Sequence, residues 1–350
     1  MKRLLSMLCA SAMACAAFTL PAAAQAIDWD SVNVKSRADI NLRDPCVLAW
    51  DGLYYVYGTG AAWPGYGCYV SRDLEAWAGP YKVFTPPAGF DGTGDWWAPE
   101  CHAYKGQFYL FASYKSASLG HRRTSVFRAD SPLGPFEEIF DIQAYPAGWD
   151  TIDGTLYVDE SGQPWMVFVH EWTSMPDGVG DFTCARLSDD FSCFVGEPVA
   201  LFKACAMPFN AGNKVTDGCW LYRSETGRLI MLWSGFRNGY CVAQAVSLSG
   251  EITGPWVQNP VLLYRKNSAH PQDGGHGALF AGPGGALTLS IHSPESKQAG
   301  QHEAPAFFEA LDRGASLTLK ENSVPWLRGA GAALWNAAVW VMCGVYGLFD

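Results

Sequence analysis

Five residues that can hold or exchange a proton stand at matching places in phrases that recur along the chain. Each follows the start of its phrase by one or two residues, and the five are Asp44, Glu100, Asp153, Asp217 and His276. If the phrases are structurally equivalent, these side chains gather in one place. Mutual repulsion and partial burial would then raise some pKa values and leave others low, which suits acid–base chemistry.

A single aspartate before Pro or Gly has a simpler explanation, because its side chain commonly caps a turn by bonding the nearby backbone. Capping alone does not explain why acids recur at the same point of successive phrases. The recurrence therefore favours a shared site.

The recurring phrase joins an apolar run to a tight glycine turn and an aromatic-rich strand. Its copies begin at residues 43, 98, 152, 216 and 275, and a second strand–turn pattern lies between them, so that each period holds about four short strands. Five such units predict an all-β fold, a five-bladed β-propeller. A two-sheet sandwich also alternates strands and turns, but it does not call for five copies of one phrase.

Composition narrows the class of partner. The chain has 350 residues, 24 Lys+Arg against 34 Asp+Glu, and 49% hydrophobic residues. It is too apolar to be disordered and too acidic to bind nucleic acid, so a neutral oligosaccharide or polysaccharide fits better.

The two ends of the chain differ from the repeats. Residues 1–26 have a basic start, an apolar run and an Ala24-Gln25-Ala26 cleavage signal, which predicts a signal peptide and export to the periplasm or the extracellular space. An uncleaved N-terminal anchor is the alternative. The propeller is expected over residues 27–324, followed by an apolar tail of unknown role at 325–350. This tail is long enough to contact a membrane, but its glycines weaken that interpretation.

In a propeller, the innermost strand of each blade runs beside the central axis, so residues at its beginning converge on one mouth of the channel. Cleaving a glycosidic bond needs one carboxylic acid to protonate the leaving oxygen and one carboxylate to activate water or attack carbon. Tryptophans near the inner strands can supply faces for sugar rings. We therefore expect substrate contacts from Trp97, Glu100, His170, Glu171, Trp172 and His276.

Ordered motifs from all five units resemble glycoside hydrolase family 43. They are Arg43-Asp44-Pro45, Trp97-Ala98-Pro99-Glu100, Ile152-Asp153-Gly154-Thr155, Thr216-Asp217-Gly218 and Gly275-His276-Gly277, with YVSRDLEAW in the first unit. The resemblance implies a five-bladed propeller that hydrolyses α-L-arabinofuranosides or β-D-xylosides with inversion at the anomeric carbon.

By resemblance, Asp44 is the general base, Asp153 orients the acid and raises its pKa, and Asp217 is the general acid. The family usually has Glu at this last position, and Asp is one methylene shorter. Glu171 is an alternative proton donor, and impaired catalysis is another outcome. An inverting enzyme is expected to hold its two carboxyls about 6.5–9.5 Å apart.

No cofactor is required for this chemistry, although the resemblance allows a structural Ca²⁺ near the propeller axis, with His276 as its candidate ligand. Calcium prefers oxygen ligands, and a lone histidine in a glycine-rich loop is more often satisfied by backbone. Two other functions stay open, namely a carbohydrate-binding propeller with impaired catalysis and a retaining hydrolase of fructan or sucrose type.

Overall fold

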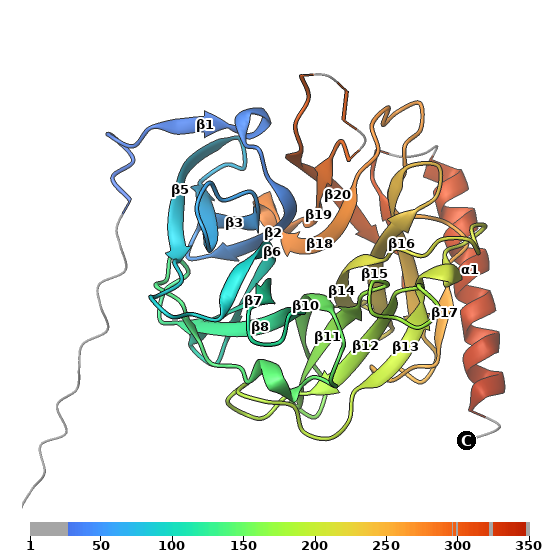
Figure 1. Ribbon diagram of the computed structural model, residues 1–350. Coiled ribbons are helices and arrows are strands. Elements are labelled where there is room, and N and C mark those ends of the chain that lie inside the picture. Colours follow the sequence, from blue (N-terminus) through green and yellow to red (C-terminus); the bar gives the residue numbers. More distant parts are fainter. Residues whose placement is uncertain (1–26, 296, 299, 322–324, 348–350) are drawn as a thin grey trace, which may run out of the picture.

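Short aromatic and β-branched segments, separated by glycine-containing and polar turns, form strands because such residues pack well on a pleated surface. The computed structural model describes residues 27–295, 297–298, 300–321 and 325–347. It shows five antiparallel sheets arranged in a ring, a five-bladed β-propeller (Figure 1). The predicted fold is confirmed, while the predicted signal peptide at 1–26 lies outside the described residues.

Each blade is one sheet whose strands follow one another from the axis outward. Blade one consists of β2 (Arg43–Trp50), β3 (Leu53–Thr59), β4 (Tyr66–Ser71) and β5 (Ala76–Phe84), with β1 (Val34–Ser36) added at its outer edge. Blade two consists of β6 (Gly92–Tyr104), β7 (Gln107–Ser116), β8 (Arg122–Ala129) and β9 (Glu137–Glu138). Blade three consists of β10 (Thr151–Val158), β11 (Pro164–His170), β12 (Asp181–Arg186) and β13 (Val199–Lys203).

The last two blades follow the same order. Blade four consists of β14 (Asp217–Arg223), β15 (Leu229–Phe236), β16 (Tyr240–Ser247) and β17 (Trp256–Gln258). Blade five consists of β18 (Gly275–Ala281), β19 (Leu287–Ser293), β20 (Ala304–Asp312) and β21 (Leu317–Leu319). The innermost strands β2, β6, β10, β14 and β18 contact their neighbours around the axis. The beginnings of five distant segments therefore come together.

Every innermost strand has a β-bulge, where one extra residue disturbs the pairing with the second strand; the bulge lies near the beginning of the strand in four blades and in the middle of the longer β6 in blade two. One residue of each bulge has a left-handed backbone, and these residues are Asp44, Ala98, Asp153, Gly218 and His276, with φ between 42° and 56°. In the alignment of the five repeated phrases, Asp217 falls at the same position as Asp44 and Asp153. In the structure Asp217 lies one position earlier, because Gly218 adopts the left-handed conformation in blade four.

The ring closes where blade five meets blade one. The Leu42 N–H donates to the carbonyl of Glu303 over 3.0 Å, and the Ser290 hydroxyl donates to the carbonyl of Pro45 over 2.7 Å. Because these bonds join opposite ends of the repeat region, closure holds the first and last bulges together.

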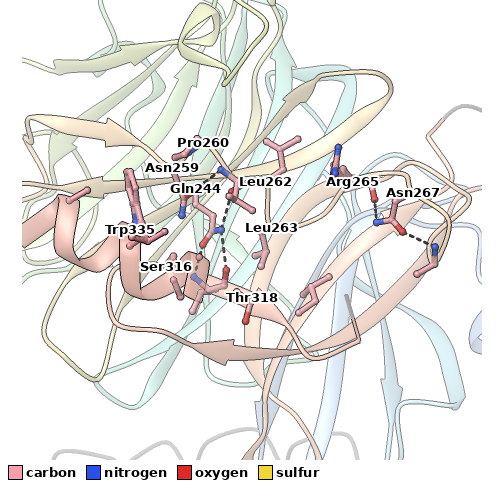
Figure 2. Close-up of a pocket in the computed structure, with 18 of the residues that line it drawn as sticks. Gln244, Asn259, Pro260, Leu262, Leu263, Arg265, Asn267, Ser316, Thr318 and Trp335 are labelled. Carbon is pink, nitrogen blue, oxygen red and sulfur yellow. Dashed lines mark hydrogen bonds between the residues drawn. The ribbon is translucent and has the colours of Figure 1, made fainter. Parts of the chain in front are cut away.

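The predicted apolar tail forms a helix, α1 (Pro325–Tyr346), against the outer edge of the propeller (Figure 1). Trp335 donates to the carbonyl of Ala315 over 2.8 Å, and the side-chain oxygen of Asn336 accepts from the Ala315 N–H over 2.9 Å. A cavity of about 680 Å³ lies between α1 and blades four and five and is lined mainly by apolar side chains. Figure 2 shows the residues that line it.

Much of α1 faces outward. By length and composition, the segment Gly329–Tyr346 could cross a membrane, and 11% of it is buried. Leu334 and Trp340 are 74% and 72% exposed.

Candidate active site

Three aspartates from different blades surround His276 at the axial end where the inner strands begin. The Nδ1 atom of His276 lies 3.2 Å from Oδ1 of Asp44 and 3.8 Å from Oδ2 of Asp153. The N–H of Gly218, next to Asp217, donates to Oδ2 of Asp153 over 3.0 Å. The structure thus brings together Asp44, Asp153, Asp217 and His276, which lie far apart in the sequence.

Asp44 is held as an anion. Burial raises its pKa, but the neighbouring His276 and His292 outweigh burial and hold the pKa well below its ordinary value. Thr59 also donates its hydroxyl proton to Oδ2 of Asp44 over 2.7 Å. A carboxylate that stays charged near neutral pH can accept a proton from water.

Asp153 and Asp217 are shifted in the opposite direction. Burial raises the pKa of Asp153 to about 7 and that of Asp217 to about 6, and His276 only partly offsets the effect. Asp44 raises both pKa values further by repulsion, as Asp217 does for Asp153. Acid–base catalysis requires one carboxyl that stays charged and another that holds a proton at the same site.

His276 balances these charges. Burial lowers its pKa, but Asp44, Asp153 and Glu100 outweigh burial and raise the pKa to about 10. Its Nε2 atom is buried without a hydrogen-bond partner among the described residues and lies 4.0 Å from Oε1 of Glu100. The ring is therefore a buried imidazolium within a ring of carboxylates.

The described axial residues do not by themselves supply a calcium site. Calcium takes about six to eight oxygen ligands, and His276 would offer a single nitrogen. Among the described residues, no group of three or more His, Cys, Asp or Glu side chains is placed to hold a metal ion. The structural cation predicted near His276 gains no support from this arrangement.

Hydrogen bonds between neighbouring blades fix the left-handed backbone of the bulges. The second strand of one blade offers a side-chain acceptor to the bulge N–H of the next, in the pairs Thr59 with Ala98, Ser113 with Asp153, Ser234 with His276 and His292 with Asp44, over 2.7 to 3.1 Å. In blade three this position holds Val169, which cannot accept, and the Gly218 N–H bonds the carboxylate of Asp153 instead.

The sequence analysis missed these acceptors. A signal was present, since Thr59, Ser113, Ser234 and His292 each follow their bulge residue by about 15 residues. Single polar residues at strand ends are too common to be singled out without the register. Tyr240, whose hydroxyl donates to Oδ2 of Asp217 over 3.1 Å, was missed for the same reason.

The other predicted substrate contacts fall into two groups. Glu100 is 2% exposed, with its Oε2 atom 3.4 Å from Nε2 of His102, so it lies buried beside His276. Trp97, His170, Glu171 and Trp172 lie in blades two and three. The ring of His170 stacks on Trp149 with a centroid distance of 3.8 Å, and burial lowers its pKa to about 4, so this histidine is neutral.

Glu171 forms a bidentate ion pair with Arg122. Both of its oxygens accept hydrogen bonds from Arg122, over 2.6 and 2.9 Å, and the guanidinium also lies over the ring of Trp97. Burial raises the pKa of Glu171, and Arg122 only partly offsets this, but the bidentate pair occupies both carboxylate oxygens. The geometry therefore favours Asp217 over Glu171 as the proton donor.

Five blades around an axial group of carboxylates define the class of propeller glycosidases, and the comparisons with known proteins agree. The sequence pattern described as glycosyl hydrolases family 43 matches residues 39–306. The chain belongs to this family. A search of curated proteins found no match.

Solved structures give the same result. An endo-arabinase from Bacteroides thetaiotaomicron VPI-5482 is 37% identical, with a TM-score of 0.70 over 80% of this chain and 97% of its own. An endo-1,4-beta-xylanase from the same organism is 25% identical, with a TM-score of 0.66 over 83% and 97%. A xylan beta-1,4-xylosidase from Bacillus halodurans C-125, at 18% identity and a TM-score of 0.63 over 81% and 55%, supports the fold alone.

Proposed function

We propose that this glycoside hydrolase is exported and cleaves α-L-arabinofuranosyl linkages, or secondarily β-D-xylosyl linkages, in plant-type polysaccharides or oligosaccharides with inversion. The observation that carries the proposal is the convergence of Asp44, Asp153 and Asp217 around His276. The 37% identity to an endo-arabinase favours arabinose over xylose.

In the proposed reaction, Asp44 takes a proton from a water molecule as the water oxygen bonds to the anomeric carbon. Asp217 gives its proton to the glycosidic oxygen as the bond between that oxygen and the anomeric carbon breaks. After one turnover Asp44 is protonated and Asp217 is charged, and exchange with solvent restores both. The low pKa of Asp44 and the raised pKa of Asp217 support these opposite roles.

Asp153 and His276 set the charge of the pair. Asp153 accepts from the Gly218 N–H and so fixes the backbone that carries Asp217, and repulsion between the two carboxyls favours keeping a proton on the pair. His276 stabilises the anion of Asp44 from 3.2 Å. Neither role requires contact with the sugar.

Kinetics of Asp44→Asn and Asp217→Asn test the proposal on arabinan, arabinoxylan and xylan oligomers. Each substitution should lower kcat by about 10³-fold, since it removes one proton-transfer group. Asp181→Asn is the matched control, because Asp181 is also buried and its pKa is also raised to about 6. Its carboxyl accepts a hydrogen bond from Thr183 within blade three and takes no part in the proposed reaction. Equal, negligible turnover by the wild type and all three variants, with sugar still bound, would indicate a carbohydrate-binding propeller.

Product stereochemistry tests inversion separately. Proton NMR of the first products should show the anomer opposite to that of the substrate. Release of the same anomer would identify a retaining enzyme, as in the fructan or sucrose alternative.

A further inference from the structure

Tyr240 and His292 connect the proposed donor to the proposed base. Tyr240 begins β16, and its hydroxyl donates to Oδ2 of Asp217 over 3.1 Å. The ring of Tyr240 stacks on the ring of His292, with centroids 5.4 Å apart and planes 23° apart. Nδ1 of His292 accepts from the Asp44 N–H over 3.1 Å. The two stacked rings thus link the carboxyl of Asp217 to the backbone of Asp44.

Both rings are held firmly. Tyr240 is 2% exposed, and a Cβ added to Gly275 would come within 2.5 Å of its ring, so glycine is what allows the ring to lie there. Its N–H donates to Oδ2 of Asp273 over 3.2 Å. His292 is fully buried, and its Nε2 pairs with Oε2 of Glu295 over 3.0 Å. Nδ1 also lies 3.4 Å from Oδ1 of Asp44, so the ring of His292 faces a carboxylate at each nitrogen.

We propose that Tyr240 is a positioning residue for the proton donor. Its hydroxyl donates a hydrogen bond to Oδ2 of Asp217, so that the other oxygen, Oδ1, carries the proton delivered to the leaving oxygen. His292 is the corresponding positioning residue for Asp44. Both assignments rest on the proposed function, in which Asp217 is the acid and Asp44 the base. The bridge also explains how the shorter Asp can serve in this position, since it aims a carboxyl that reaches less far than Glu.

The electrostatic surroundings of Asp217 permit this role. Burial and the carboxylate of Asp217 raise the pKa of Tyr240 well above its ordinary value, so the hydroxyl remains a donor throughout the working range. The charged groups that act on Asp217 are Asp44 and Arg43 from β2, Asp153 from β10 and His276 from β18. Of the side chains acting on Asp217, Tyr240 is the one with a described hydrogen bond to its carboxyl.

The test is Tyr240→Phe in the full chain, which removes the hydroxyl and keeps the stacked ring. Unactivated arabino-oligosaccharides need protonation of the leaving oxygen, whereas a 2,4-dinitrophenyl glycoside does not. We expect kcat to fall about tenfold on the oligosaccharides and less than about twofold on the dinitrophenyl substrate. The alkaline limb of the kcat/KM profile should move to higher pH, because the lost hydrogen bond stabilised the charged form of Asp217.

Two variants sharpen the test. Tyr222→Phe is the matched control, because Tyr222 donates to Oδ2 of Asp312 over 2.8 Å within blades four and five and should leave both activities unchanged. His292→Leu removes the acceptor for the Asp44 N–H and should slow both substrates equally, since attack by water is needed whatever the leaving group.

Several outcomes decide the proposal. A loss confined to unactivated substrates cannot come from unfolding, which would lower both activities. An equal loss on both substrates with an unmoved alkaline limb would overturn the role of Tyr240, even where Asp217→Asn shows the expected selective defect. If Asp217→Asn itself shows no preference between substrates, Asp217 is not the donor, and the proposed function and the role of Tyr240 fail together.

Discussion

The axial end of the propeller and its outer edge at α1 are built from opposite kinds of side chain. At the axis, Asp44, Asp153 and His276 are buried, ionisable and held by hydrogen bonds from neighbouring blades. At the outer edge, α1 packs through a few contacts around Trp335 and Asn336 and leaves apolar side chains exposed.

The difference shows where this molecule carries strain. Asp44, Asp153 and His276 adopt left-handed φ values that cost non-glycine residues about 1 kcal/mol or more, and burying ionisable side chains adds to this cost. Positive φ also occurs at residues outside the axial group such as Asp51 and Asn238, but at the axis it coincides with buried ionisable groups, a combination typical of functional sites. Among the described residues of α1 none has a positive φ, so changes there should alter stability without altering chemistry.

Of the changes that test this contrast, Asp153→Asn at the axis should have the largest effect. We expect kcat to fall about 100-fold, because Asp217 loses the neighbouring carboxyl whose repulsion favours holding a proton on the pair. Burial raises the pKa of Asp153 to about 7, so the folded state favours the protonated form. The stability that the protonated carboxyl of Asp153 contributes is fully present below about pH 4 and is lost as the pH rises through about 7.

Asparagine removes this titration and can still accept the Gly218 N–H. Above pH 7 the variant should therefore be more stable than the wild type, by on the order of 2 kcal/mol. Chemical denaturation between pH 4 and 8 measures the difference. A wild-type curve that stays flat over this range would contradict the raised pKa.

Gly218→Ala should have the next largest effect, because an added Cβ would lie 2.6 Å from Cδ2 of His276. We expect a loss of about 2 kcal/mol of stability and about a tenfold fall in kcat, as the imidazolium and Asp217 are pushed apart. Gly227→Ala is the control, since this glycine also has positive φ but has no atom within 4 Å of the added Cβ. Similar kinetics for both variants would show that the close approach to His276 is unimportant.

At the outer edge, Trp335→Ala should lower the free energy of unfolding by about 2 kcal/mol, since a half-buried ring and its hydrogen bond to Ala315 are lost. The kcat of the folded fraction should not change. Trp340→Ala, at a 72% exposed position of the same helix, should change neither quantity. A fall in kcat for Trp335→Ala would link α1 to the site and weaken the contrast between the two regions.

The smallest effect is expected for Ser234→Ala, which leaves the buried N–H of His276 without its acceptor. We expect a loss of about 1 kcal/mol, measured by urea unfolding, with kcat reduced less than about threefold. Val169 already shows that one blade can do without a side-chain acceptor at this position. A larger kinetic than stability effect would mean that Ser234 acts on the chemistry rather than on the bulge.

The sequence predicted the fold because five copies of one phrase demand five equivalent units, and alternating apolar residues with glycine turns specify strands locally. It also selected Asp44, Asp153 and His276, which occupy equivalent positions in their bulges. It misplaced Asp217 by one position, because a bulge absorbs an extra residue and only the backbone shows that Gly218 takes the left-handed conformation.

The sequence by itself determined the repeating unit and the residue types at the start of each inner strand, since both depend on short-range patterns. The tertiary structure alone decided which atoms face one another: Arg122 with Glu171, Tyr240 with Asp217, and His292 with Asp44. These pairs join residues 23 to 248 positions apart. Their contacts depend on how far each strand twists and how closely each blade packs against the next, and no local pattern encodes those quantities.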